Sequence, residues 1–399
     1  GRQRRLNSVG ESVLQIAPSA AAAYSLRSLT GGDPVVVRVR RSSNNAEQDF
    51  TSSGVSSGAL TSFVNEIQTL GTVTNSVGND GFTLTNKSST GFTATTDTAT
   101  GVCGWPYTAK AGDKITVSFD AVVRSGTPQF IPRKATALSG SNLVDVVSDS
   151  AISVNSTASY SFEFTYDSDE AGSLTFSEGD DNADFDISNF KVTAFKGAGL
   201  VETWYDQSGN SNDAVQATAA EQPKIVDAGS LLTAGVTFDG GDSLSVSGEP
   251  VITASSSGVY SAFGVQTVAT SSEAGYLYGN ASSSNGSSLY ANTATFTLSN
   301  KNVVTLDNIS RSSGQNLLSA VYNNGDAGLL VNGAGTMTDA GTYDFSAGSS
   351  DFIIGNRNGG SASATFLTGS INEIVIYNSN QSSNRTALET EIISHYGIS

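Results

Sequence analysis

Short runs of alternating apolar and polar residues, separated by small polar turn residues, most constrain how this chain folds. The runs KITVSFDAVV and SYSFEFTY alternate with period two, the pattern of strands with one buried and one exposed face. Glycine accounts for 42 of the 399 residues, and only 14% of the residues are charged. These features indicate an all-β protein rather than a helical bundle or a leucine-rich α/β enzyme.

The character of the sequence changes twice along the chain. Strand-like runs such as GFTLTN, SLTFSE and FDISNFKVTAF follow one another closely from about 69 to 198. From 199 on, the sequence again resembles the first 68 residues in composition and pattern. Turn residues separate the runs at the spacing expected of a β-sandwich. An insertion is easily accommodated where the two ends of a loop lie close together. We therefore predict two β-sandwiches, one at 19–68 and 199–399 and the other inserted at 69–198, after a basic N-terminal arm at 1–18.

Few helices are expected, and all of them are short. Residues 19–29 follow a proline and predict one helix, and residues 58–68 predict a second. Residues 382–397 predict a third, because an apolar pair spaced i, i+4 precedes a closing glycine. The segment PVVVRVRR at 34–41 alternates after its valine run and predicts a strand.

Charge is unevenly distributed and limits the partners of the chain. The formal net charge is −17, yet the segment through Arg41 holds seven arginines and only two acids. The acidic remainder repels nucleic acid, whose binding requires neutralised phosphates. We expect the N-terminal arm, with Arg2, Arg4 and Arg5, to dock on an acidic neighbour in a larger assembly; a solvated tail is the alternative. No run of 18 apolar residues is present, so no membrane span is expected.

Scarce residue types exclude several classes of site. Cys103 is the only cysteine and His395 the only histidine. An intrachain disulfide, a cysteine-ligated zinc site and a CxxC redox pair are therefore excluded. No glycine-rich phosphate-binding motif follows a strand, so nucleotide chemistry has no support. His395 lies at the predicted end of the C-terminal helix, where a partly exposed structural role is expected.

An acidic segment is the one candidate metal site. Residues 163–186 contain nine acids and no basic residue. Clustered carboxylates are the ligands that Ca²⁺ prefers, and Asp180, Asp181 and Asp184 are the candidate ligands. No EF-hand spacing is present, so a solvated acidic loop without any cofactor is the alternative that we favour.

Several segments resemble a known enzyme family. AAAAYSLRSL and the following strand (20–50), VETWYDQSGNSNDAVQATAAEQPKIV (201–226) and YLYGNAS (276–282) resemble the catalytic domain of fungal-type α-L-arabinofuranosidase B. The core WYDQSGN is the most specific part of this resemblance. The tail at 366–397 is similar to the closing strand and helix of concanavalin-like (LamG-type) jelly rolls. The resemblance implies that the split sandwich is a concanavalin-like jelly roll.

The two acids that this family uses for catalysis are missing. The resemblance implies a retaining glycosidase, which needs two carboxyl groups about 5–5.5 Å apart. No Asp or Glu lies between Glu273 and Asp307, where the nucleophile is expected, and none lies between Asp351 and Glu373, where the acid/base is expected. The second region offers Arg357 and its neighbouring asparagines instead. We therefore predict that the chain is not an enzyme.

Four residues are candidate ligand contacts. The insert resembles the jelly rolls of carbohydrate-binding modules, in which exposed aromatic rings stack on sugars. Trp105 and Tyr107, which flank a proline, are candidates for such a platform or for a buried pair. Asp206 is either a sugar or cation ligand or a turn former, and its polar context favours the turn. Arg357 is the fourth candidate.

The combination of a split sandwich and a module-like insert resembles proteins of tailed bacteriophages. We predict a non-catalytic virion structural protein, namely a capsid decoration, a tail fibre or a tail adhesin, located on the virion surface or outside the cell. Expected partners are other virion proteins and host-surface glycans, bound through homo-oligomers or repeated copies. The alternative is a secreted α-L-arabinofuranosidase-like glycoside hydrolase using other acids, such as Asp206 with Glu202 or Glu273, or a bacterial cell-surface carbohydrate-binding protein.

Overall fold

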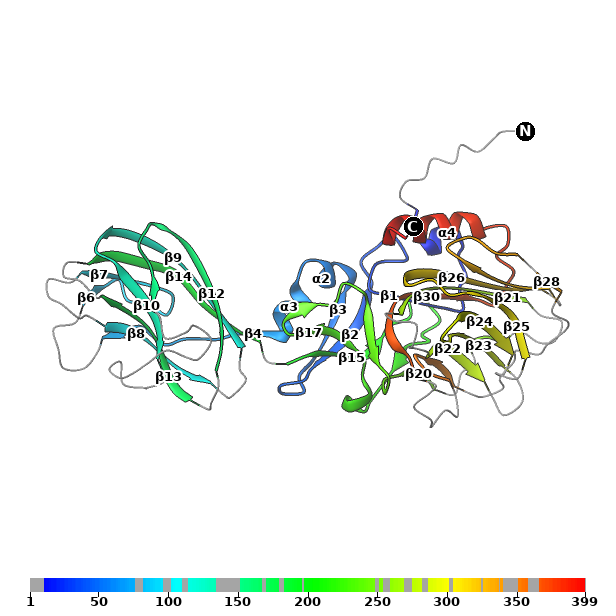
Figure 1. Cartoon of the computed structure of the whole chain (residues 1–399), viewed down its shortest axis with the longest axis horizontal. Helices are drawn as coiled ribbons and strands as arrows, with labels where there is room; N and C mark the ends of the chain where they lie inside the picture. The colour runs from blue at the N-terminus through cyan, green and yellow to red at the C-terminus, as the bar shows by residue number, and fades with distance from the viewer. Residues whose placement is uncertain are drawn as a thin grey trace, which may run out of the picture. The chain divides into compact units, whose positions relative to one another are not determined.

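The computed structural model confirms the predicted all-β fold class (Figure 1). It describes residues 11–75, 82–95, 102–109, 114–133, 151–166, 170–178, 183–195, 197–247, 251–253, 259–268, 275–281, 286–300, 304–323, 326–336, 338–339, 351–357 and 366–398. Within these ranges almost every element is a strand in an antiparallel pair. The described helices are α1 (Val13–Ile16), α2 (Ser52–Ser56), α3 (Ala59–Val64) and α4 (Arg385–Tyr396), with one 3₁₀ turn, η1 (Ala219–Glu221). No helix in the described part is long and apolar enough to cross a membrane.

The chain divides into two compact units. The first comprises Gly1–Thr61 and Gly197–Ser399, and the second comprises Ser62–Lys196. The insert predicted at 69–198 therefore begins a few residues sooner in the structure. The reason is β4 (Asn65–Ile67), which pairs with a strand of the second unit and so joins its sheet.

The second unit is a sandwich of two antiparallel sheets. One sheet has the strand order β11-β10-β13-β8-β5, and the other has the order β12-β9-β14-β7-β6, with β4 beside β14. The strands are β5 (Thr74–Asn75), β6 (Thr83–Thr85), β7 (Phe92–Thr95), β8 (Val102–Ala109), β9 (Lys114–Ser125), β10 (Pro128–Arg133), β11 (Ile152–Ser153), β12 (Ala158–Thr165), β13 (Glu170–Glu178) and β14 (Asp184–Phe195). Aromatic rings fill the space between the sheets, and the Trp105 and Phe190 rings stack 4.0 Å apart at its centre.

The strands of the first unit form one antiparallel network that closes on itself. Its longest strands lie side by side in the order β26-β21-β30, and β30 also pairs with β1 and β19. The strands are β1 (Ala22–Ser25), β2 (Val35–Arg41), β3 (Glu47–Thr51), β15 (Gly199–Trp204), β16 (Ala214–Val215), β17 (Lys224–Asp227), β18 (Ser230–Leu231), β19 (Val236–Asp239), β20 (Leu244–Val246), β21 (Val259–Val268), β22 (Gly275–Ala281), β23 (Gly286–Ala291), β24 (Thr295–Asn300), β25 (Val304–Ser310), β26 (Gly314–Asn323), β27 (Asp326–Val331), β28 (Thr338–Asp339), β29 (Phe352–Ile354) and β30 (Thr368–Tyr377).

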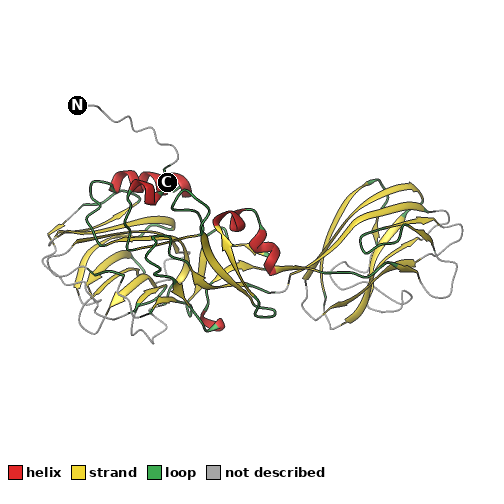
Figure 2. Cartoon of the chain, turned by 180° about the vertical axis from the view of Figure 1, so that it is seen from behind, coloured by secondary structure: helices red, strands yellow, loops and turns green. Residues whose placement is uncertain are grey.

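Both ends of the described chain pack on the same face of this network. Leu388 and Ile392 of α4 and Val13 of α1 are buried against Phe263 and Val375 of the central strands. Figure 2 shows the two helices lying over these strands. Helix α4 ends where the predicted glycine adopts a left-handed conformation, with φ 63°, which favours glycine over any other residue.

The predicted helix at 19–29 is wrong. Residues 22–25 form strand β1, which pairs with β30 so that Tyr24 lies opposite Ile374. All four strand residues are buried, so the segment is covered on both faces. An alanine-rich sequence favours a helix in isolation, but pairing with a buried strand decides the conformation here.

Replacing Trp105 by Ala tests the core of the second unit. The side chain is fully buried, so its loss leaves a cavity, and we expect the free energy of unfolding to fall by about 3–5 kcal/mol. Denaturant unfolding followed by circular dichroism measures the change. Val122→Ala is the matched control, because Val122 is 43% exposed, and it should change stability by no more than about 0.5 kcal/mol. A W105A variant as stable as the parent contradicts this core assignment.

Candidate functional site

A pocket of about 600 Å³ lies in the first unit, between the loop after β1, helix α2, the middle of β30 and the last turn of α4. We call it the α4 pocket. Its lining residues include Arg27, Asp33, Leu232, Asn372 and His395. This volume lies within the range of about 300–1,000 Å³ that is typical of small-molecule sites.

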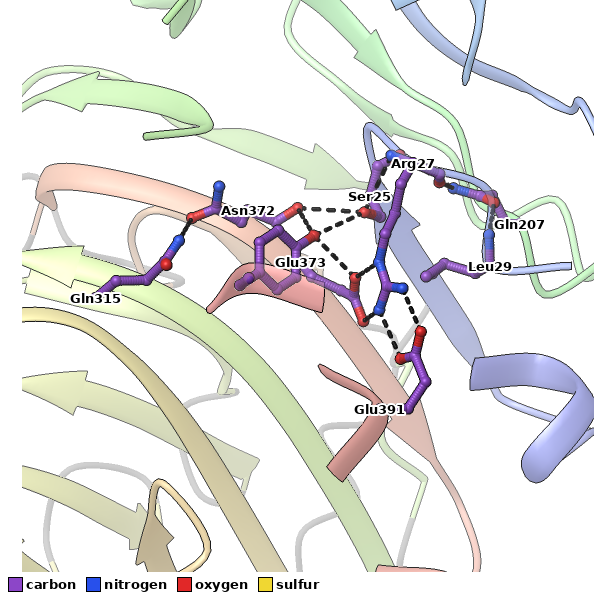
Figure 3. Close-up of polar contacts among 9 residues, drawn as sticks. Ser25, Arg27, Leu29, Gln207, Gln315, Asn372, Glu373 and Glu391 are labelled. Carbon is purple, nitrogen blue, oxygen red and sulfur yellow. Dashed lines mark hydrogen bonds and ion pairs between the residues drawn. The ribbon is translucent and has the colours of Figure 1, made fainter. Parts of the chain in front are cut away.

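Arg27 and Tyr396 line the α4 pocket and belong to an ion-pair cluster (Figure 3), whose carboxylates, Glu373 and Glu391, lie behind them and are not among the lining residues. The Arg27 guanidinium donates to Glu373 Oε2 at 2.7 Å and Oε1 at 3.1 Å. It also donates to Glu391 Oε1 at 2.5 Å and Oε2 at 2.8 Å. The Tyr396 hydroxyl donates to Glu373 Oε2 at 2.9 Å. One arginine therefore binds two carboxylates from β30 and α4, each through two oxygens.

Burial controls the protonation of this cluster. The Glu373 side chain is 1% exposed, and burial raises its pKa, while the Arg27 charge and the hydrogen bonds of Arg27 and Tyr396 oppose that rise. Burial disfavours the charged form of Arg27, but the hydrogen bond to Glu391 and the charge of Glu373 keep the Arg27 pKa above its usual value. Burial and the Arg27 charge lower the pKa of His395, so its imidazole is neutral at pH 7.

The WYDQSGN segment holds the loop that carries Arg27. The Gln207 amide donates to the carbonyl oxygens of Ser25 and Arg27, at 3.0 and 2.9 Å, and its oxygen accepts the backbone N–H of Leu29 at 2.8 Å. Gln207 is 7% exposed, so these three buried backbone groups depend on it. Its neighbour Asp206 stands out in the sequence as a candidate ligand, whereas nothing in the local pattern marks Gln207.

Asp206 itself forms a turn. Its carboxylate accepts the backbone N–H groups of Ala23, Ser208 and Asn212 at 2.8, 2.9 and 3.1 Å, and the Ser208 hydroxyl at 2.6 Å. These contacts occupy both carboxylate oxygens, so the geometry favours the turn-forming role over the alternative role of a sugar or cation ligand.

A free hydrogen-bond donor faces the α4 pocket. Asn372 is 7% exposed, and its Oδ1 accepts the Gln315 amide at 2.9 Å. Its Nδ2 donates to no other group in the described part of the chain, and Figure 3 shows this nitrogen without a contact. This nitrogen is not among the fully buried unpaired atoms, so solvent reaches it from the pocket, and a ligand hydroxyl or carbonyl can take the place of water there.

The opposite rim carries a fixed negative charge. The Asp33 carboxylate accepts the Ser53 hydroxyl at 2.6 Å, the Ser53 backbone N–H at 2.8 Å and the Ser52 hydroxyl at 2.8 Å. These hydrogen bonds lower the pKa of Asp33 to about 2, so it is ionised at any physiological pH. With Glu373 and Glu391 facing a single arginine, the pocket and its wall carry a net negative charge.

Trp105 and Tyr107 are buried and form no exposed platform. Trp105 is 0% and Tyr107 5% exposed, and both belong to the core of the second unit. Period-two alternation in β8 places their side chains on the face that packs against the other sheet, while Pro106 between them points outward. A buried ring cannot stack on a sugar, so of the two interpretations the buried pair fits the structure and the platform does not.

Arg357 is placed beside aromatic rings. Its guanidinium lies 5.6 Å from the Tyr276 ring centre, and the Tyr276 and Tyr290 rings are 4.8 Å apart. The contact is a cation–π interaction between the end of β29 and strand β22. It lies outside the α4 pocket, and its expected ligand role stays a prediction.

Of the three candidate calcium ligands, Asp180, Asp181 and Asp184, only Asp184 lies in the described part of the chain. Asp180 and Asp181 lie outside the described ranges, as do Arg2, Arg4 and Arg5 of the N-terminal arm. Asp184 binds Arg124, whose Nε lies 2.8 Å from Asp184 Oδ1. The part of the chain that the structure describes holds no group of three His, Cys, Asp or Glu residues placed to bind a metal. Calcium binding stays a prediction.

A second acidic pair lies in the turn between β19 and β20. Asp242 is 3% exposed, and its Oδ2 accepts the backbone N–H of Asp239 at 2.9 Å. Burial, together with the charge of the Asp239 carboxylate, raises the pKa of Asp242 to about 6. Neither residue lines the α4 pocket.

The residues that build the α4 pocket carry no local sequence signal. Arg27 and Glu373 are 346 positions apart, and Arg27 and Glu391 are 364 apart. His395, expected at a helix end, does lie in the last turn of α4 and lines the pocket. Only the fold brings these residues together.

Similarity to known proteins is confined to solved structures. No protein-family model matches the chain, and no curated protein matches it. An arabinofuranosidase complexed with arabinofuranosyl-α-1,2-xylobiose is 16% identical, with a TM-score of 0.38 over 49% of this chain and 51% of that chain. A mutant Trypanosoma rangeli sialidase displaying trans-sialidase activity is 14% identical, with a TM-score of 0.35 over 48% and 31% of the two chains. The NanB sialidase of Streptococcus pneumoniae is 15% identical, with a TM-score of 0.27 over 32% and 23%. The chain spans about half, or less, of each.

The prediction of a non-enzyme is corrected by these comparisons. It rested on two missing acids, whereas the matching solved structures are glycoside hydrolases, namely arabinofuranosidases and sialidases. The comparisons give no support to a virion or bacteriophage role, which stays a prediction.

Replacing Arg27 by Met tests the ion-pair cluster. Glu373 is then buried without a cation, and we expect the free energy of unfolding at pH 8 to fall by about 3–5 kcal/mol. The loss should shrink toward pH 4. The folded chain binds the Glu373 proton more tightly than the unfolded chain, and that proton removes the buried charge. Denaturant titrations at both pH values measure the difference.

Arg38→Met is the matched control for that experiment. Its ion pair with Asp49 is exposed, at 39% and 42% of the two side chains, so the loss should be about 0–1 kcal/mol. Equal losses for R27M at pH 4 and pH 8 would contradict the assignment of a buried, charge-compensated Glu373.

Replacing Asp242 by Asn tests the second acidic pair. Because the folded state raises this pKa, ionisation of Asp242 lowers stability as the pH rises from about 4 to above 6. The Asn side chain can still accept the Asp239 N–H, so we expect D242N to be more stable than the parent by about 1–3 kcal/mol at pH 7.5. The two proteins should become equal near pH 4 in thermal unfolding. A pH-independent difference between them contradicts the raised pKa.

Proposed function

We propose that the protein is a carbohydrate-binding protein that takes a neutral saccharide in the α4 pocket. The observation that carries this proposal is the unpartnered amide nitrogen of the buried Asn372, which faces a pocket of about 600 Å³. A saccharide hydroxyl is a suitable acceptor for such a donor.

The remaining lining supports a saccharide rather than a purely apolar ligand. Leu231, Leu232 and Val55 offer apolar surface to the C–H groups of a sugar ring, and Ser28 and Ser56 offer hydroxyls. Asp33, Glu373 and Glu391 outnumber the single cation Arg27, while His395 is neutral. The field therefore disfavours anionic ligands and favours neutral ones.

Hydrolysis at the same pocket is the second candidate function. It is favoured by two carboxylates beside the pocket, of which the buried Glu373 has a raised pKa and Glu391 is more exposed. A buried carboxyl group with a raised pKa beside a second carboxylate is the pattern of a general acid and its partner. Both carboxylates bind Arg27, so catalysis would require one of them to be released by the substrate.

Binding is tested with arabinofuranosyl-α-1,2-xylobiose as the neutral probe and sialyllactose as the acidic probe. Isothermal titration calorimetry on the full chain should show saturable binding of the neutral probe and at least tenfold weaker binding of the acidic one. Asn372→Leu should weaken binding by about tenfold, which corresponds to ~1.4 kcal/mol. Asn308→Leu, at an exposed position away from the pocket, is the control and should bind as the parent does.

A second variant keeps the proposal falsifiable if N372L does not fold. Thr233 is exposed and lines the pocket, so Thr233→Trp should fill it without disturbing the core. Unchanged affinity in T233W, or no binding of any neutral saccharide by the parent, would overturn the proposal. Release of 4-nitrophenol from an aryl arabinofuranoside, abolished by Glu391→Gln, would select hydrolysis over binding alone.

A further inference from the structure

A second pocket of about 480 Å³ lies within the second unit. We call it the insert pocket, and its lining includes Gln68, Thr69, Thr90, Phe190 and Lys191. Three segments meet there: the chain after β4, the turn between β6 and β7, and the middle of β14. Backbone hydrogen bonds from Gln68 to Val192, at 2.9 Å, and from Phe190 to Thr90, at 2.8 Å, hold them together.

A bulge in β14 shapes this pocket. The pairing of β14 with β9 shifts register between Ser188 and Lys191, and Asn189 at the shift has φ 53°, in the left-handed region. A bulge of this kind re-aims the side chains beside it. The Phe190 ring stays in the core, stacked on Trp105, while Lys191 is exposed at the pocket.

The insert pocket offers free donors and no acid. In the described ranges, neither the Gln68 amide nor the Lys191 ammonium has a hydrogen-bond or ion-pair partner. The Asn189 amide is occupied, because it donates to Asp120 Oδ2 at 2.7 Å. Thr69, Ser89 and Thr90 add hydroxyls, Leu70 and Phe190 add apolar surface, and no Asp or Glu is among the described residues that line the pocket.

We propose that the insert pocket is a second ligand site, independent of the α4 pocket, that binds an acidic saccharide. Lys191 supplies a charge-assisted hydrogen bond to a sugar carboxylate, which is stronger than a neutral one. The Gln68 amide and the hydroxyls bind the sugar hydroxyls, and the pocket volume suits a small ligand. Lys191 is the one charged residue among the described residues that line the pocket, and the neighbouring Asp120 carboxylate is occupied by hydrogen bonds from Ser159 and Asn189.

The aromatic core supplies a reporter for this pocket. Trp105 and Trp204 are the two tryptophans of the chain, and Trp204 belongs to the first unit. Phe190 lines the insert pocket and stacks on Trp105 with ring centres 4.0 Å apart and an interplanar angle of 16°. Trp204→Phe therefore leaves Trp105 as the single tryptophan, and its emission, excited at a wavelength that tyrosine does not absorb, reports on the insert pocket.

The experiment titrates the full W204F chain with trigalacturonate and with its methyl ester, which lacks the charge. We expect a saturable change in Trp105 fluorescence with trigalacturonate, and at least tenfold weaker binding of the ester. Lys191→Met should weaken trigalacturonate binding at least tenfold. Lys114→Met is the matched control: it removes the same charge from the same unit, where Lys114 pairs with Glu163 at 2.7 Å, and should stay within twofold of the parent.

Other outcomes overturn the proposal. Equal affinity for trigalacturonate and its methyl ester, or an unchanged affinity for trigalacturonate in K191M, would show that Lys191 does not bind the sugar carboxylate. Equal binding of a tri-glutamate peptide would show that the pocket takes acidic ligands without recognising sugar hydroxyls. Gln68→Leu provides a second variant and should weaken binding without changing charge. Thr233→Trp fills the α4 pocket and should leave trigalacturonate binding unchanged, so this result is separate from that of the proposed function.

Discussion

The first unit depends on the contact between two segments that are far apart in the sequence. The polar loop after Trp204 binds the backbone of residues 20–29 through the side chains of Asp206, Gln207 and Asn210. The Asn210 amide donates to the Ala20 carbonyl at 2.8 Å, and the Tyr24 hydroxyl donates in return to the Asn212 carbonyl at 2.5 Å. Buried backbone groups that lie outside a sheet need such partners, and here side chains supply them.

This contact makes the two segments depend on each other. Asp206 and Gln207 are useful only if the opposite strand presents its N–H and C=O groups at matching positions. The strand, in turn, needs the loop in order to end at Ser25 and turn toward Arg27. The Arg27 guanidinium then reaches Glu373 and Glu391, so the wall of the α4 pocket is built on the loop, although no loop residue enters it.

Features with a local physical cause can be predicted from the sequence. Period-two alternation predicts the long strands β9 and β12, and the apolar pair Leu388 and Ile392 predicts α4. Residues 19–29 depart from the predicted helix because pairing with β30 decides their conformation. Cys103, Trp105 and Tyr107 alternate along β8, so all three side chains lie on the same, buried face of the strand. This alternation in the sequence is already an argument against an exposed platform at Trp105. The α4 pocket is not predictable, because its charges come from segments that share no local pattern.

The packing of α1 against α4 has a consequence for how the chain is made. Val13 and Ala17 share a hydrophobic cluster with Leu388 and Ile392, so the first unit closes only after the last helix has left the ribosome. The second unit is continuous from Ser62 to Lys196 and has all its strands available much sooner. Domains generally fold as units during synthesis. The second unit can thus complete its fold while the strands of the first unit that follow Lys196 have not yet been translated.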